Sequence, residues 1–130
     1  MRGKMHMAAP LPFVGQKRMF AKEYIKILPQ FNDKTVFVDL FGGSGLLSHI
    51  TKHLRPEATV VYNDYDNYRE RLAHIPQTNA LLADLRAIVG NTPKHKRIDG
   101  EMREKMFERL RHEEQTVGYI DFITISASVM

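Results

Sequence analysis

The fold of this chain is decided by ten consecutive residues, Val36-Phe37-Val38-Asp39-Leu40-Phe41-Gly42-Gly43-Ser44-Gly45. Residues 36–41 form an apolar, β-prone run with one aspartate in it, and such a run predicts a buried central strand of a parallel sheet. The glycines that follow let the backbone turn sharply and approach a ligand closely. The stretch therefore predicts a strand that ends in a ligand-binding turn.

The residues after the turn complete a βαβ unit. Apolar residues recur at helical spacing over residues 46–54, and Pro56 ends that helix. Residues 59–62 are a short β-prone run that ends in Asn63-Asp64. The order strand, glycine turn, helix, strand predicts an α/β fold of Rossmann-like type.

The segment before this unit predicts one amphipathic helix, over residues 16–28. The apolar face of this helix holds Phe20, Tyr24, Ile27 and Leu28. A stiff, Pro-containing segment at 10–15 precedes it, and residues 1–9 are expected to be a loose arm.

The segment after the unit predicts further helices. Tyr68, Leu72 and Ile75 fit a short helix, and Thr78 is expected to cap the next one. The buried side of that next helix holds Leu81, Leu82, Leu85, Ile88 and Val89. A charged helix at 101–115 carries a narrow apolar stripe of Met102, Met106 and Leu110. Residues 117–130 are left unassigned.

Composition limits the classes of protein and of site. The 130 residues suit one domain, 1–130, and 43% hydrophobic and 26% charged residues are ordinary for a globular protein. A net charge of +4 and a pI of about 9.4 are compatible with a polyanionic partner. The absence of cysteine excludes disulfides, thiolate zinc sites and cysteine nucleophiles. With no membrane-length or signal-type apolar run, we expect a cytoplasmic setting.

Two aspartates at predicted strand ends indicate the class of ligand. In doubly wound folds, ligands bind outside the carboxyl ends of the strands. A carboxylate at Asp39 can meet the α-ammonium of S-adenosylmethionine. Asp64, at the end of the next strand, can accept hydrogen bonds from a ribose diol. Nicotinamide and S-adenosylmethionine sites both use such an acid, so Asp64 leaves both open.

The glycine pattern favours S-adenosylmethionine. A dinucleotide fingerprint that starts at Gly43 puts Ser48 where Gly or Ala is expected. An aspartate before the glycines is also unfavourable beside a pyrophosphate, since like charges repel. No Gly-Lys-Ser/Thr follows, so the P-loop pattern is absent.

Three motifs together resemble the Dam-like (D12-class) adenine-specific DNA methyltransferases. Residues 39–45 are similar to the first cofactor motif, Asp/Glu-Pro/Leu-Phe-x-Gly-x-Gly. Residues 12–18 resemble the N-terminal motif, although they depart from its commoner Trp-x-Gly-Gly-Lys form, and residues 62–67 resemble the motif whose acid holds the ribose. The motifs stand in family order, and the similarity covers about residues 10–70.

The resemblance implies roles for nine residues and a partner. Lys17 and the backbone from Phe13 to Gly15 border the methionine end of S-adenosylmethionine. Beneath the cofactor, the turn is made by Asp39, Phe41, Gly43 and Gly45. Asp64 holds the ribose and Tyr65 packs near the adenine. The family's full-length members imply double-stranded DNA as the partner, with no metal and no membrane.

One family motif is absent from the chain. Adenine amino-methyltransferases use Asp/Asn-Pro-Pro-Tyr/Phe/Trp to accept hydrogen bonds from the target amine and to stack on the flipped base. The six prolines stand at 10, 12, 29, 56, 76 and 93, and no two are adjacent. We therefore expect an incomplete Rossmann-like sheet, no catalytic residues and no activity of the chain alone. The chain would be shortened for expression, a shortened gene product such as a decayed prophage gene, or part of a split enzyme.

Other interpretations stay open at this point. The chain is alternatively a non-catalytic fragment or relic, a nicotinamide-dependent oxidoreductase, or a DNA-binding module without cofactor. His49 and His53 are spaced for a metal, but Ile50 stands where a zinc-protease motif needs Glu, so surface or packing roles are favoured. The basic run 94–97 predicts either a contact with DNA phosphate or a solvated loop.

Overall fold

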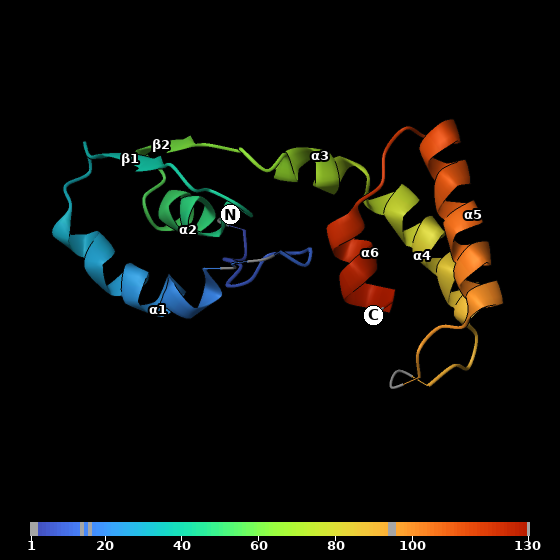
Figure 1. Cartoon of the computed structure of the whole chain (residues 1–130). Coiled ribbons are helices and arrows are strands. Elements are labelled where there is room, and N and C mark those ends of the chain that lie inside the picture. Colours follow the sequence, from blue (N-terminus) through green and yellow to red (C-terminus); the bar gives the residue numbers. More distant parts are fainter. Residues whose placement is uncertain (1–2, 14, 16, 94–95, 130) are drawn as a thin grey trace. The chain divides into compact units, whose positions relative to one another are not determined.

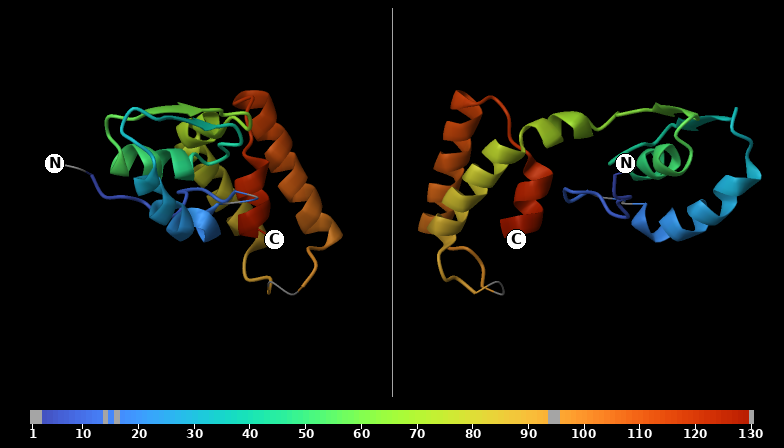
Figure 2. Two further views of the ribbon diagram at one scale, coloured as in Figure 1. Left: turned by 90° about the vertical axis from the view of Figure 1, so that its left-hand side faces the viewer. Right: turned by 180° about the vertical axis from the view of Figure 1, so that it is seen from behind.

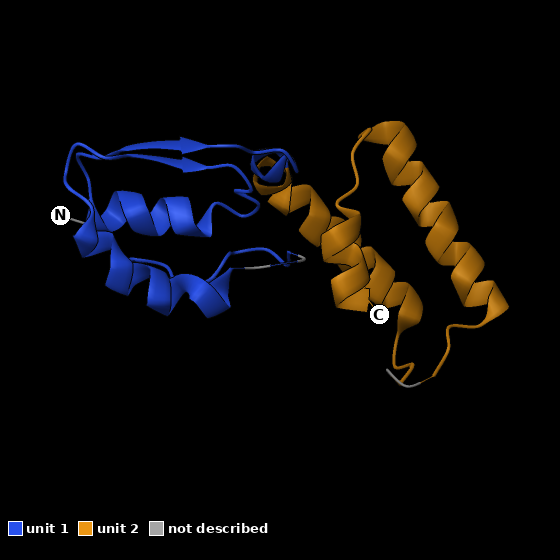
Figure 3. Ribbon diagram, turned by 60° about the vertical axis from the view of Figure 1, so that its left-hand side comes forward, with its two compact units in different colours: residues 1–70 blue, residues 71–130 orange. Residues whose placement is uncertain are grey.

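The structure is a computed structural model that describes residues 3–13, 15, 17–93 and 96–129 (Figure 1). The chain divides into two compact units, Met1–Glu70 and Arg71–Met130 (Figure 3). Each unit is described by itself, and the single domain 1–130 stays a prediction.

The first unit contains the predicted βαβ arrangement. It holds α1 (Arg18–Ile27), the 3-10 helix η1 (Leu28–Gln30), β1 (Val36–Asp39), α2 (Leu46–Leu54) and β2 (Thr59–Tyr62). The two strands pair in parallel, from Val36 opposite Thr59 to Asp39 opposite Tyr62. The strands lie over α2, and α1 packs against the other side of α2 (Figures 1 and 2). The chain is therefore a mixed α/β protein with a small parallel sheet, and the full Rossmann-like sheet stays a prediction.

β1 was predicted to be a buried central strand, and the predicted burial was wrong. Val36 is 58% exposed and Val38 is 57% exposed, whereas Phe37 packs against the core. Successive side chains of a strand point to opposite faces, and α2 covers only one of them. The sheet in the described part of the chain has two strands, and within the first unit α2 is the helix that packs against it.

The core of the first unit lies between α1 and α2. Its buried members are Ala21, Leu28, Leu46 and Ile50, and Met5 and Met7 of the N-terminal arm pack against them. The predicted apolar face of α1 was only partly right, because Phe20 is 66% exposed and Ile27 is 44% exposed. The face that packs against α2 keeps Tyr24 and Leu28 of the prediction and adds Ala21 and Ile25. These four residues have the i, i+3, i+4, i+7 spacing of one helical face.

The second unit is helical. The boundary falls within α3 (Tyr68–Ala73), and α4 (Ile75–Val89) packs against both α5 (Gly100–Thr116) and α6 (Phe122–Val129). The predicted buried side of α4 is confirmed, since Leu81, Leu82 and Leu85 join Ile125 in one core. The predicted cap at Thr78 was wrong, because α4 begins at Ile75, with a proline in its first turn. Thr78 is a buried residue inside that helix.

A buried ion pair links α3 to the start of α6. Arg71 Nε donates to Asp121 Oδ2 at 3.0 Å, and the side chains of Arg71 and Asp121 are 5% and 2% exposed. Thr124 donates its backbone N–H and its hydroxyl to the same carboxylate, at 3.0 and 2.7 Å. Burial opposes ionisation of Asp121, but the hydrogen bonds from Thr124 and Arg71 outweigh it, and the pKa is lowered below its ordinary 3.8.

We predict that Asp121→Ala lowers the free energy of unfolding by about 3–5 kcal/mol, because it leaves the Arg71 charge buried without its partner. Urea unfolding followed by circular dichroism measures this change. The contribution of Asp121 should be present above about pH 4 and lost as the pH falls through the lowered folded-state pKa.

The matched control is Lys105→Ala, which breaks the exposed ion pair between Lys105 and Glu101. Water and salt screen that pair, so the midpoint should not move measurably. Equal effects of the two substitutions would contradict a stabilising role for the buried pair.

Candidate functional site

Asp39, the last residue of β1, receives hydrogen bonds from two helices. Lys17 Nζ, at the start of α1, is 3.3 Å from Asp39 Oδ1, and Ser48 Oγ of α2 donates to Asp39 Oδ2 at 2.8 Å. The Lys17 ammonium also donates to the backbone carbonyl of Phe41. The side chains of Lys17 and Asp39 are 29% and 15% exposed, so a ligand can still reach this pair of opposite charges.

The turn after β1 requires glycine for two physical reasons. The backbone at Gly43 and Gly45 has φ of +51° and +70°, a region that side chains disfavour. A Cβ at Gly43 would also lie 2.8 Å from Cε1 of Phe13. The Gly45 N–H donates to the Gly42 carbonyl at 2.7 Å and closes the turn. The predicted sharp turn is confirmed.

Tyr62, the last residue of β2, packs against this turn. A Cβ at Gly42 would lie 2.1 Å from Cε2 of the Tyr62 ring, so the ring fills the space beside the glycine. The Tyr62 hydroxyl donates to the Gly43 carbonyl at 2.5 Å and is 3.2 Å from Asp64 Oδ1. Burial, and then the negative charge of Asp64, raise the pKa of the Tyr62 hydroxyl above its ordinary 10.0.

Asp64 binds the first amides of α3. Its Oδ1 accepts from the backbone N–H of Tyr68 at 2.6 Å, and its Oδ2 accepts from that of Arg69 at 3.0 Å. A carboxylate at a helix N-terminus satisfies free N–H groups and suits the helix dipole. Asp64 therefore has a structural role, whatever ligand it also binds.

The predicted site residues fall into three groups in the first unit. Lys17, Asp39 and the Phe41 carbonyl meet at the end of β1. Phe13 lies against Gly43, and its ring meets the Tyr68 ring edge-on at 5.7 Å. Gly15 lines a small hollow with these residues, while the predicted backbone contact at Val14 lies outside the described residues.

The third group is exposed. The side chains of Phe41 and Tyr65 are 83% and 84% exposed, and they are free to contact a ligand rather than the core. Asp64 is linked to the turn through its contact with Tyr62, whose hydroxyl also reaches the Gly43 carbonyl.

Sequence reasoning missed Ser48 and Tyr62 as members of the site. In the sequence, Ser48 was noted only as a mismatch to the dinucleotide-binding pattern. In the structure, Ser48 lies near the start of α2, which packs against β1, and its hydroxyl therefore reaches Asp39. Tyr62 could have been found from the strands themselves. Two parallel strands of equal length that end together place Tyr62 opposite Asp39.

The histidine pair has packing contacts. His49 Nε2 accepts from the His6 backbone N–H at 3.2 Å, and the rings of His49 and His53 lie 6.2 Å apart. Burial, and then the nearby charges of His6 and His53, lower the pKa of His49. Among the residues that the structure describes, no group of three or more His, Asp or Glu could hold a metal ion.

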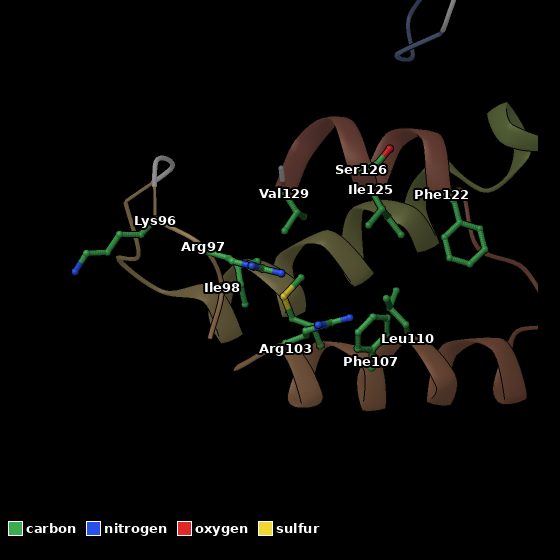
Figure 4. Close-up of a pocket in the computed structure, with 11 residues that line it drawn as sticks. Lys96, Arg97, Ile98, Arg103, Phe107, Leu110, Phe122, Ile125, Ser126 and Val129 are labelled. Carbon is green, nitrogen blue, oxygen red and sulfur yellow. The ribbon is translucent and has the colours of Figure 1, made fainter. Parts of the chain in front are cut away.

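The second unit has a separate, larger hollow of about 560 Å³. It is lined by Lys96, Arg97, Ile98, Arg103, Met106, Phe107, Leu110, Phe122, Ile125, Ser126 and Val129 (Figure 4). Arg97 and Arg103 extend from two different segments toward its interior (Figure 4), and the Arg103 guanidinium lies 5.4 Å from the centre of the Phe107 ring. Lys94 and His95 of the basic run lie outside the described residues. In the described part of the chain, no helix is long and apolar enough to span a membrane.

We predict that Gly42→Ala disrupts the turn, because a Cβ there would also lie 2.8 Å from the Asn63 carbonyl oxygen. Moving a strand backbone and an aromatic ring should cost roughly 1–3 kcal/mol of stability, measured by thermal unfolding. The control is Gly100→Ala, at a helical residue where a Cβ meets nothing within 4 Å, and it should leave stability equal or higher. Equal melting temperatures of the two variants would show that the turn has room for a side chain at Gly42.

Comparisons with known proteins identify the family of the chain. The model of the family described as D12 class N6 adenine-specific DNA methyltransferase matches residues 13–129. A Haemophilus influenzae (strain ATCC 51907 / DSM 11121 / KW20 / Rd) protein named "Putative methyltransferase" is 45% identical over 112 residues. That match covers 82% of this chain, and the chain spans 38% of the length of that relative. No solved structure matches. The family match covers most of the chain, from the N-terminal motif to α6, and so confirms the resemblance in the sequence: the chain belongs to the D12 class N6 adenine-specific DNA methyltransferase family.

Proposed function

We propose that this chain binds S-adenosylmethionine as the cofactor part of an adenine-specific DNA methyltransferase. The observation that carries the proposal is the Lys17–Asp39 pair at the carboxyl end of β1. The methionine end of the cofactor is a zwitterion. Its α-carboxylate suits the Lys17 ammonium, and its α-ammonium suits the Asp39 carboxylate and the Phe41 carbonyl. The family membership makes a methyl donor the expected ligand.

The remaining donors and acceptors fit the rest of that cofactor. The oxygens of Asp64 accept from Tyr68, Arg69 and Tyr62. A carboxylate has about four acceptor positions, so one is left for a ribose hydroxyl. The hollow beside Lys17 and Phe13 measures about 20 Å³, which is room for about one water. The cofactor therefore lies across the open strand ends, where the exposed rings of Phe41 and Tyr65 offer surfaces for it.

In this proposal the chain binds the cofactor but does not transfer its methyl group. The cofactor, when bound, supplies a methyl group on its sulfonium. Transfer to adenine needs preorganised acceptors for the target amine, which the Pro-Pro motif provides and this sequence lacks. The whole family protein is expected to act on double-stranded DNA in the cytoplasm. The cations Lys96, Arg97 and Arg103 on the hollow of the second unit are the groups we assign to its phosphates.

Two alternative functions make different predictions. A nicotinamide-dependent oxidoreductase would place a pyrophosphate at the turn, where Asp39 would repel it. A DNA-binding module without cofactor, or a relic that binds nothing, would have no use for the Lys17–Asp39 pair. The oxidoreductase predicts binding of NAD, weakened by replacement of Asp64, whereas the module without cofactor and the relic predict no binding of S-adenosylmethionine or NAD.

We predict that isothermal calorimetry detects binding of S-adenosylmethionine and S-adenosylhomocysteine but not of NAD. Asp39→Asn and Asp64→Asn should each weaken binding roughly 10- to 100-fold, because each removes a charged hydrogen bond. Asp66→Asn is the control, since Asp66 is an exposed neighbour of Asp64 and changes the net charge equally. Binding of NAD without S-adenosylmethionine, or no binding of either, would refute the proposal.

We also predict that the purified 130-residue chain does not methylate adenine-containing duplex DNA. A filter assay with a tritiated methyl donor measures transfer. Robust methylation would contradict the requirement for the Pro-Pro motif.

We predict that DNA binding by the chain weakens steeply as the salt concentration rises, and that Arg97→Gln together with Arg103→Gln makes this dependence less steep. Fluorescence anisotropy measures the binding.

A further inference from the structure

The side chain of Tyr62 connects two segments that serve different ends of the proposed cofactor. The glycine turn lies beneath the methionine end, and Asp64 lies at the ribose end. The Tyr62 hydroxyl is 2.5 Å from the Gly43 carbonyl oxygen and 3.2 Å from Asp64 Oδ1. A phenol has one proton, so the two acceptors share it, and the shorter contact gives Gly43 the larger share.

Strand pairing and the glycine turn position the ring of Tyr62 on one side, while 36% of the residue stays exposed. Tyr62 stands opposite Asp39 in the parallel register, so its backbone position follows from strand pairing. Its ring lies directly beside Gly42, and Cζ would be 3.5 Å from a Cβ at Gly45. Asn63 ties the same chain segment to β1, because its side-chain amide donates to the Leu40 carbonyl at 2.9 Å. A ring fixed on this side leaves its hydroxyl little freedom.

We propose that Tyr62 is a positioning residue, whose hydroxyl holds the Gly43 carbonyl and the Asp64 carboxylate at the spacing that one S-adenosylmethionine molecule requires. This inference rests on the proposed function. It assigns to Tyr62 no contact with the cofactor, and it predicts that Tyr62 acts through Asp64.

The test is Tyr62→Phe, which keeps the ring beside Gly42 and removes only the hydroxyl. Titration with S-adenosylhomocysteine should show binding weakened roughly threefold to tenfold, as expected for one lost hydrogen bond. The matched control is Tyr24→Phe in the same unit. It removes the hydrogen bond between Tyr24 and Thr51, which is 2.6 Å long and joins α1 to α2. The control should lower the melting temperature to a similar extent and leave the affinity unchanged.

A double-mutant cycle separates positioning from a general loss of stability. If Tyr62 acts through Asp64, Tyr62→Phe should weaken binding much less in an Asp64→Asn background than in the wild type. Effects on affinity that multiply independently would overturn the inference. So would an affinity of Tyr62→Phe within twofold of the wild type.

A measurement without ligand distinguishes this inference from the proposed function. In ¹⁵N NMR spectra of the free chain, Tyr62→Phe should shift the amide signals of Tyr68 and Arg69, which donate to Asp64, and those of the glycine turn. Tyr24→Phe should leave them in place. Unchanged amide signals would overturn the proposed role of Tyr62 even if the cofactor binds. If the signals move but the wild type binds no S-adenosylhomocysteine, the proposed function fails, and the contacts of Tyr62 with Gly43 and Asp64 remain as a structural link.

Discussion

The parallel pairing of β1 with β2 is the constraint on which the rest of the first unit depends. It brings Asp39 opposite Tyr62, so that the two strands end together and both following loops start from the same edge. The Asn63 N–H donates to the Asp39 carbonyl at 3.1 Å and extends the pairing by one residue. Every group of the candidate site is then placed by a short connection from this edge. Phe13, Gly15 and Lys17 are the exceptions, because they lie just before α1 and reach the site from there.

The two aspartates at this edge have hydrogen-bond partners within the chain. Asp39 is neutralised by Lys17 and held by Ser48, and Asp64 is held by two helix amides. A carboxylate with such partners keeps its orientation, which suits the recognition of a cationic or hydroxyl-bearing ligand. The same partners also stabilise the fold, so substitutions here need controls that separate stability from binding.

The second unit is organised by a different interaction. Its apolar core joins α4, α5 and α6, but the link between α3 and α6 is the buried pair of Arg71 and Asp121 with Thr124. A buried pair of this kind makes the approach of two elements specific, because a shifted packing would leave a charge without a partner. The basic, apolar-lined hollow of this unit lies between α5 and α6, and both helices contribute lining residues (Figure 4).

Much of this architecture could be predicted from the order of residues along the chain. The β-prone run, the glycines and the helical spacing of 46–54 predicted the βαβ unit, because these are local backbone preferences and periodicities. The motifs at 12–18, 39–45 and 62–67 indicated the family for the same reason, since each is a continuous segment. The absence of adjacent prolines could also be seen in the sequence alone.

Tertiary structure decided what depends on contacts between distant segments. The exposure of Val36 and Val38 follows from how many elements cover the sheet, and hydropathy along one strand does not contain that number. The helix-capping role of Asp64 and the start of α4 at Ile75 depend on which amides the folded chain presents. Ser48 and Tyr62 became part of the site because packing brings their hydroxyls to Asp39, Gly43 and Asp64, and those distances are set by the fold and not by the spacing along the chain.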